Sequence, residues 1–249
     1  MTPENASAVE PQPAGMGEFS RIVGVFFEPG KTFADIAQRP SWIVPMILLI
    51  LAGIGFTMAL SQRIGWDRVI RQQNEASSRV QQMSPEQREQ AVAVQMKIMP
   101  ATYYGASVVG APIFAIIVAA VLLGITAMMS AGLRFKQVFA VVLWGSLPRV
   151  IAGILTVVVI FLKNPDDFNI RNPLAFNVGA FMDPNSGSKF MYTLATSLDL
   201  FTIWTILLLA TGLKAAAGKK LSFTGALVAV VTPWAVVVLA GSAVAGMFG

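Results

Sequence analysis

The sequence predicts an all-α fold, a polytopic membrane bundle of about five transmembrane helices. The first reason is composition, since 55% of the 249 residues are hydrophobic and 12% are charged, about half the ~25% charge of a soluble domain. The second is patterning, because the apolar residues form long uninterrupted blocks, and a helix of about 20 apolar residues crosses the core of a bilayer. Lipid offers backbone amides no hydrogen-bond partner, so these blocks must coil into helices.

The residue types exclude several kinds of chemistry. The chain has no cysteine and no histidine, which removes disulfides, thiol nucleophiles, thiolate metal sites and imidazole bases. We therefore expect no catalytic residue, no metal and no cofactor. The net charge of +5 is spread over loops between apolar blocks. That distribution indicates contact with anionic lipid headgroups and not with nucleic acid.

The N-terminal part predicts a tail followed by surface helices. Residues 1–18 are rich in Pro, Ala, Gly and Glu and contain no Lys or Arg, so we expect a disordered tail. Residues 19–40 predict two short amphipathic helices on either side of Pro29-Gly30. Both are too short to span, so we expect interfacial helices that lie on the headgroups. Three basic side chains would then reach water or phosphate: Arg21, Lys31 and Arg39.

The remaining residues, 41–249, predict the membrane domain. Its spans are expected near 41–61, 104–131, 137–162, 190–213 and 223–247. The polar segment 62–100, between the first two spans, predicts two polar helices outside the bilayer. Within it, Ser84-Pro85-Glu86-Gln87 has the cap, the first-turn proline and the third-position Gln of a helix start.

The charges of the short loops predict the orientation. The turn between spans 2 and 3 carries Arg134 and Lys136, and the turn between spans 4 and 5 carries Lys214, Lys219 and Lys220. Basic short loops stay in the cytoplasm. The N-terminus is therefore expected in the cytoplasm and the C-terminus outside.

Two charges fall inside predicted spans, Arg149 and Asp199. Such charges cost at least ~2.5 kcal/mol and usually face a partner or a cavity. Counted from the ends of spans 3 and 4 that share a loop, their depths are about 20 Å and roughly 14 Å. We therefore expect an intramembrane Arg149–Asp199 ion pair. It would either line a substrate or proton path or fix packing, and we favour packing because a relay needs several ionisable groups in series.

From about residue 19 onward the chain resembles the Yip family, five-span membrane proteins named for interacting with Rab-type GTPases, and specifically its bacterial branch. The resemblance rests on the order and spacing of several motifs. They are Phe27-x-Pro29, Phe33-Ala34-Asp35-Ile36, Pro40-x-Trp42, Asn172-Pro173-Leu174, Leu198-Asp199-Leu200-Phe201-x-x-Trp204 and Thr211-Gly212-Leu213. It implies these family-type positions: Pro29, Phe33, Pro40, Pro173, Asp199, Trp204 and Gly212.

The resemblance also implies a cytoplasmic N-terminus, no known catalytic activity and, in eukaryotic members, roles in vesicle trafficking and membrane shaping. The bacterial branch implies the inner membrane. GTPase binding is not transferred, because the N-terminal tail is short and no long ordered cytoplasmic domain is present to dock a GTPase.

Three functions follow from these observations. The leading one is a non-enzymatic membrane scaffold or organiser that binds lipids and other membrane proteins, or a second copy of itself. The alternative is a small transporter or transporter subunit with a path near Arg149 and Asp199. A membrane-embedded enzyme comes third, since His and Cys are absent. A water-accessible cavity that reaches Arg149 would favour transport, whereas a close-packed interior would favour the organiser.

Overall fold

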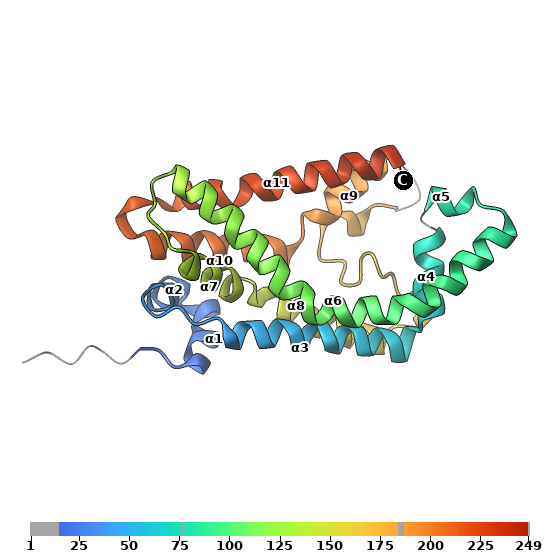
Figure 1. The fold of residues 1–249 in the computed structure, drawn as a ribbon, viewed down its shortest axis with the longest axis horizontal. Coiled ribbons are helices and arrows are strands. Elements are labelled where there is room, and N and C mark those ends of the chain that lie inside the picture. The colour runs from blue at the N-terminus through green and yellow to red at the C-terminus, as the bar shows by residue number, and fades with distance from the viewer. Residues whose placement is uncertain (1–14, 76, 184–186, 249) are drawn as a thin grey trace, which may run out of the picture.

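A computed structural model describes residues 15–75, 77–183 and 187–248, and these form an elongated helical bundle (Figure 1). Most of the predicted tail lies outside the described residues. The helices, in order, are α1 (Glu18–Phe27), α2 (Pro29–Gln38), α3 (Ile43–Ala59), α4 (Trp66–Glu75), α5 (Ser78–Gln81), α6 (Pro85–Met128), α7 (Phe135–Gly145), α8 (Leu147–Leu162), α9 (Lys189–Ser197), α10 (Leu200–Ala217) and α11 (Phe223–Phe248).

The predicted all-α membrane bundle is confirmed. In the described part of the chain, 5 helices are long and apolar enough to cross a membrane. They are Ile43–Ile64, Pro85–Met128, Phe135–Leu162, Leu200–Lys220 and Phe223–Met247. Their apolar side chains are largely exposed on α3, α6, α8 and α11, as expected of surfaces that face lipid.

Helix α6 is longer than expected, because the polar segment and the second span form one helix. It begins at the predicted site, where Ser84 and Gln87 form a reciprocal capping box. It then continues for 44 residues through Pro100 and Pro112. At about 1.5 Å per residue this is ~66 Å, roughly twice the ~30 Å core of a bilayer. The prediction that span 2 is separate from the polar helices is therefore wrong.

Two expected spans are interrupted. The third changes direction at Ser146, where α7 ends and α8 begins with Pro148 in its first turn. The fourth is not one helix over 190–213, since α9 ends at Ser197 and Asp199 caps α10. The physical reason is that an Asp side chain is more favourable at a helix N-terminus, where it accepts from free amides, than in a helix interior.

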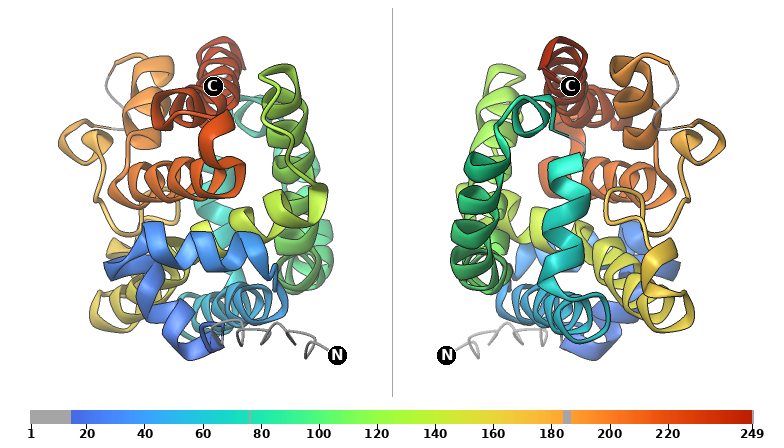
Figure 2. Two further views of the ribbon diagram at one scale, coloured as in Figure 1. Left: turned by 90° about the vertical axis from the view of Figure 1, so that its left-hand side faces the viewer. Right: turned by 90° about the vertical axis from the view of Figure 1, so that its right-hand side faces the viewer.

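The N-terminal helices belong to the bundle core. Val25 of α1 and Phe33 and Ile36 of α2 are completely buried, in the same cluster as residues of α7 and α10. Two hydrogen bonds from α7 hold the end of α2 and the link that follows it, from Gln137 Nε2 to the Ala37 carbonyl (3.1 Å) and from Trp144 Nε1 to the Ser41 carbonyl (2.9 Å). Figure 2 shows α2 crossing the end of the bundle.

Arg21 lies at the centre of this attachment, with 3% of its surface exposed. Its guanidinium pairs with Asp35 of α2 at 2.6 Å and with Glu18 at 3.3 Å. It also donates to the Ser41 hydroxyl at 2.7 Å and to the Arg39 carbonyl at 3.2 Å. The expectation that Arg21 reaches water or phosphate is therefore wrong, because folding surrounds this cation with acceptors from both helices and from the entry to α3.

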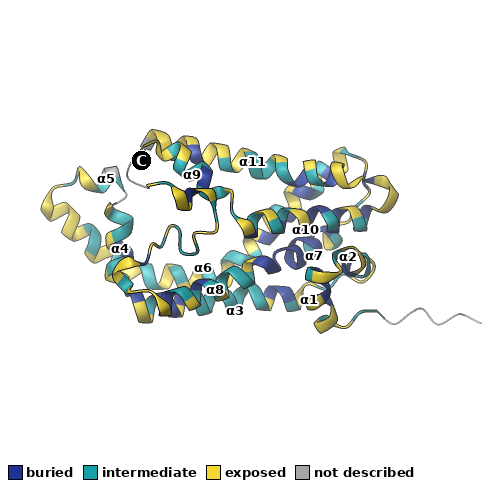
Figure 3. Cartoon of the chain, turned by 180° about the vertical axis from the view of Figure 1, so that it is seen from behind, coloured by how far each residue is buried: buried dark blue, intermediate teal, exposed yellow. Residues whose placement is uncertain are grey.

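Helix α10 passes close to α2 and α7 at Gly212. A Cβ placed on Gly212 would lie 2.5 Å from Val141 Cγ1 and 2.9 Å from Phe33 Cδ1. Phe26 of α1 meets Trp204 edge-on in the same region, with ring centroids 5.3 Å apart. Figure 3 shows the buried residues gathered around α7 and α10.

Replacing Arg21 with Met should lower the free energy of unfolding by about 3 kcal/mol, because it leaves the Asp35 carboxylate without its buried cation. Thermal unfolding in detergent measures this. Lys31→Met is the matched control, since Lys31 pairs with Glu28 at the surface, with side chains 73% and 62% exposed, and should change stability by less than about 1 kcal/mol. Equal losses of stability in the two variants would contradict the conclusion that Arg21 holds α1 and α2 to the bundle.

Gly212→Ala should destabilise the fold by ~1–3 kcal/mol through overpacking against Phe33 and Val141. Gly241→Ala in α11 is the control, because no heavy atom lies within 4 Å of the added Cβ. Alanine is the better helix former, so the control should be neutral or slightly stabilised. Equal thermal midpoints for the two variants would refute close packing at Gly212.

Candidate functional site

Arg149 lies in the first turn of α8, just after the change of direction at Ser146. Its side chain is exposed and borders two cavities. Its ring partner is Phe114 of α6, whose centroid lies 4.8 Å from the Arg149 Cζ atom.

The predicted direct ion pair between Arg149 and Asp199 is not formed. No carboxylate oxygen of the described residues lies within 4.0 Å of the Arg149 guanidinium. Asp199 is nevertheless close enough to attract this cation through space. The two residues are therefore neighbours without contact.

Asp199 instead caps α10. Its Oδ1 atom accepts from the amides of Phe201 (2.6 Å) and Thr202 (2.9 Å), and its Oδ2 accepts from the Thr202 hydroxyl (3.3 Å). These bonds occupy both carboxylate oxygens. They turn the carboxylate toward the helix N-terminus, which explains why it does not reach Arg149.

The loop that contains Pro173 supports this cap. Asn177 forms an isolated antiparallel bridge with Asp199, and the Leu200 amide donates to the Phe176 carbonyl at 3.1 Å. The Asn172 and Asn177 side chains hydrogen-bond each other, with the shorter bond at 2.6 Å. The Asn172-Pro173-Leu174 motif thus shapes a turn that holds the start of α10.

A cavity of about 420 Å³ lies beside Arg149, within the usual range of small-molecule sites; we refer to it as the Arg149 cavity. Residues of α6, α7, α8, α10 and α11 line it. They are Phe114, Ile117, Val118, Val121, Leu122, Val142, Ser146, Arg149, Thr202, Thr205, Ile206, Leu209, Val230, Pro233, Trp234, Val237 and Val238. Arg149 is the charged member of this lining, three side chains carry hydroxyl groups, and Trp234 carries an indole N–H.

A smaller cavity of about 220 Å³ lies on the other side of the Phe114–Arg149 contact, between α3, α6, α7 and α8. Phe114, Ser146 and Arg149 line both cavities. A water-accessible cavity that reaches Arg149 is the feature expected to favour transport; both cavities reach Arg149, and most of their lining is apolar. The arrangement could hold an anion beside Arg149, but the lining offers no acid to pass a proton onward.

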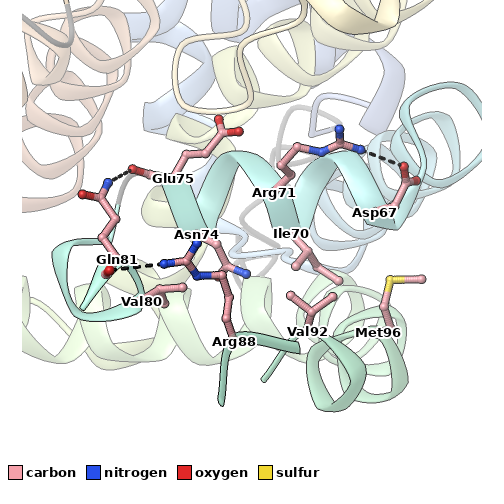
Figure 4. A pocket seen from close by; sticks show the side chains of 10 residues that line it. All are labelled: Asp67, Ile70, Arg71, Asn74, Glu75, Val80, Gln81, Arg88, Val92 and Met96. Atoms are coloured by element: carbon pink, nitrogen blue, oxygen red, sulfur yellow. Dashed lines mark hydrogen bonds and ion pairs between the residues drawn. The ribbon is translucent and has the colours of Figure 1, made fainter. Parts of the chain in front are cut away.

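A third cavity, of about 580 Å³, lies at the polar end among α4, α5 and α6 (Figure 4). Both of its arginines already have partners within the chain. Arg71 contacts Asp67 at 3.4 Å, and Arg88 donates to the Gln81 carbonyl at 3.2 Å. Nearby, the hydrogen bond and charge of Asp166 raise the pKa of Arg68 above its ordinary value. Both arginines of the cavity are therefore occupied, and we refer to this end, formed by α4, α5 and the start of α6, as the polar cap.

The family-type positions fall into two groups. Pro29 starts α2, Phe33 is buried in the core, and Trp204 and Gly212 face the N-terminal helices from α10. Pro40 lies in the link before α3. Pro173 and Asp199 form the second group at the start of α10.

A family model described as the Yip1 domain matches residues 23–244. The chain belongs to the Yip1 domain family. The match covers nearly the whole membrane bundle, so the resemblance to the Yip family is confirmed, while the bacterial branch stays a prediction. No curated protein and no solved structure gave a significant match.

The sequence analysis identified Arg149 but not the other residues that line the Arg149 cavity. Thr205 is one of them, and its hydroxyl is buried without a partner in the described residues. A threonine in an apolar helix carries no distinctive sequence signal. Pro148, which lies in the first turn of α8, is the feature of the sequence that indicates a new helix after Ser146.

Asp199→Asn should preserve the cap, because the amide oxygen can accept the same two bonds, whereas Asp199→Ala should cost ~1 kcal/mol. Thermal unfolding in detergent compares them. A structural ion pair with Arg149 would instead make Asn as damaging as Ala. Combined with Arg149→Gln, either change should be additive within about 0.5 kcal/mol.

Proposed function

We propose that this Yip1 domain protein is a non-enzymatic membrane organiser that holds an amphipathic helix in the membrane surface at its basic end. The supporting observation is the apolar stripe on α1. Phe19, Val23 and Phe27 are 78%, 41% and 81% exposed, although the helix that carries them is fixed to the bundle by Arg21. A rigidly presented apolar stripe of this kind inserts between lipid headgroups.

Charge supports the same surface. The end of the bundle that carries α1 and α2 also carries the α6–α7 and α10–α11 turns (Figure 1). Its exposed basic side chains are Lys31, Arg39, Arg134, Lys136, Lys214, Lys219 and Lys220. Basic residues at this level attract anionic leaflets, by about 1 kcal/mol each.

We further propose that this basic end is cytoplasmic and that the C-terminus is outside, because basic short loops are retained in the cytoplasm. The C-terminus lies toward the opposite end of the bundle from α1 (Figure 1). The inner membrane of a bacterium is the proposed location. The lipid-facing sides of α3, α6, α8 and α11 would meet lipids, other membrane proteins or a second copy.

Site-directed fluorescence tests the orientation of α1, and the absence of cysteine from the chain makes single labels possible. A fluorophore on Phe27→Cys in vesicles should be quenched by lipids spin-labelled close to the headgroup. Val94→Cys is the control, because Val94 is 57% exposed on the polar part of α6 and should remain unquenched. A water-exposed label at position 27 would contradict the proposal.

Lipid retention tests the organising role itself. Polymer nanodiscs cut from the native membrane should hold more anionic lipid around the wild-type protein than the bulk membrane contains. Lys219→Gln combined with Lys220→Gln should reduce this enrichment, whereas Phe19→Ser combined with Phe27→Ser should release α1 from the surface. If the nanodiscs around the wild-type protein have the same lipid composition as the bulk membrane, the proposed organising role would be wrong.

Transport is the second candidate, and the Arg149 cavity is the observation that favours it. The interruption between α7 and α8 places Arg149 beside two cavities, and interrupted helices are a feature of transporter binding sites. Phe114→Cys, which lines both cavities, would react with a membrane-impermeant thiol reagent added from either side if a path exists. If the cysteine at position 114 does not react with the reagent from either side of the membrane, the result would favour the organiser.

A further inference from the structure

The Arg149 cavity contains a cation that no carboxylate of the described residues contacts directly. A guanidinium has five N–H donors, and no side-chain acceptor or carboxylate of the described residues contacts those of Arg149. The Phe114 ring offers one face, which stabilises a cation less than a paired carboxylate does. A charge in apolar surroundings therefore leaves room for an anionic ligand.

The three hydroxyl groups that line the cavity differ in whether they have a hydrogen-bond partner. The Ser146 hydroxyl donates to the Val142 carbonyl at 2.7 Å, and the Thr202 hydroxyl donates to Asp199. Thr205 also lines the cavity but has no partner in the described residues, and only 5% of the residue is exposed. Rotation about its Cα–Cβ bond can turn this hydroxyl toward a ligand.

The rest of the wall is apolar and opens sideways. Ile117 and Val121 of α6 are 57% and 43% exposed, and Val237 of α11 is 71% exposed. These side chains form the outer rim of the cavity on the two helices. The opening between α6 and α11 therefore leads into the lipid phase, so a ligand can enter from the bilayer.

We propose that the Arg149 cavity binds a membrane-borne anionic amphiphile, a single aliphatic chain with a carboxylate head. The carboxylate accepts N–H bonds from Arg149 and a hydroxyl bond from Thr205. The aliphatic chain lies along Ile117, Val121 and Val237 toward the bilayer. This binding goes beyond the organising role and does not depend on α1 or on the basic end.

Photocrosslinking tests the site. Wild-type protein in neutral-lipid nanodiscs is irradiated with a fatty acid that carries a diazirine in its chain, and labelled peptides are identified by mass spectrometry. Label should appear in the α6 peptide around Ile117–Val121 and in the α11 peptide around Val237. The matched fatty alcohol, which has the same chain without the charge, should label these peptides about tenfold less.

Three variants assign the binding to the proposed groups. Arg149→Gln should reduce labelling about tenfold, and Arg149→Lys should retain part of it. Thr205→Val should reduce labelling about threefold. Thr211→Val is the control, because the Thr211 hydroxyl bonds its own helix at the Leu207 carbonyl, and labelling should not change. Unfolding in the same nanodiscs verifies that each variant is folded.

Several outcomes would overturn the proposal. Equal labelling by the acid and the alcohol would show an apolar groove without a role for Arg149. Labelling of the folded Arg149→Gln variant at the wild-type level would also show that Arg149 has no role in binding. Competition of the acid by chloride or phosphate at low concentration would identify a small-anion site, and label spread evenly over α3 and α8 would identify general lipid contact.

Discussion

The buried guanidinium of Arg21 is the interaction on which the arrangement of the N-terminal end depends. It joins α1, α2 and the entry to α3 through Glu18, Asp35, Ser41 and the Arg39 carbonyl. A cation so enclosed is stable only while all its acceptors stay in place. The consequence is that two short helices, which would be only marginally stable alone in water, become a fixed part of the bundle and position Phe33 against α7 and α10.

The sequence predicted the number and nature of the membrane helices because hydropathy is a local property, summed along the chain. It also predicted the start of α6 at Ser84, since a capping box is local too. The sequence-based prediction was wrong for Arg21, whose side chain can adopt either of two environments. Arg21 could reach headgroups or bury itself, and the choice depends on Asp35 and Ser41, which only the tertiary fold brings to it.

The same limit applies to the candidate site. The ion pair between Arg149 and Asp199 was expected because depth within a span can be counted from sequence, and the direct pair is not formed in the described residues. Contact between them was not predictable by counting. Asp199 sits at a helix start, where two backbone amides compete for its carboxylate, and that competition leaves Arg149 facing a cavity whose walls come from helices far apart in the chain.

Helix α6 joins two environments with one continuous rod. Its polar half packs with α4, and its apolar half carries Phe114 beside Arg149. Pro100 and Pro112 each remove one backbone donor from this helix, yet no loop separates its two halves. The position of the Phe114 ring is therefore tied to the polar cap through one helical backbone, so the two regions share a single structural element.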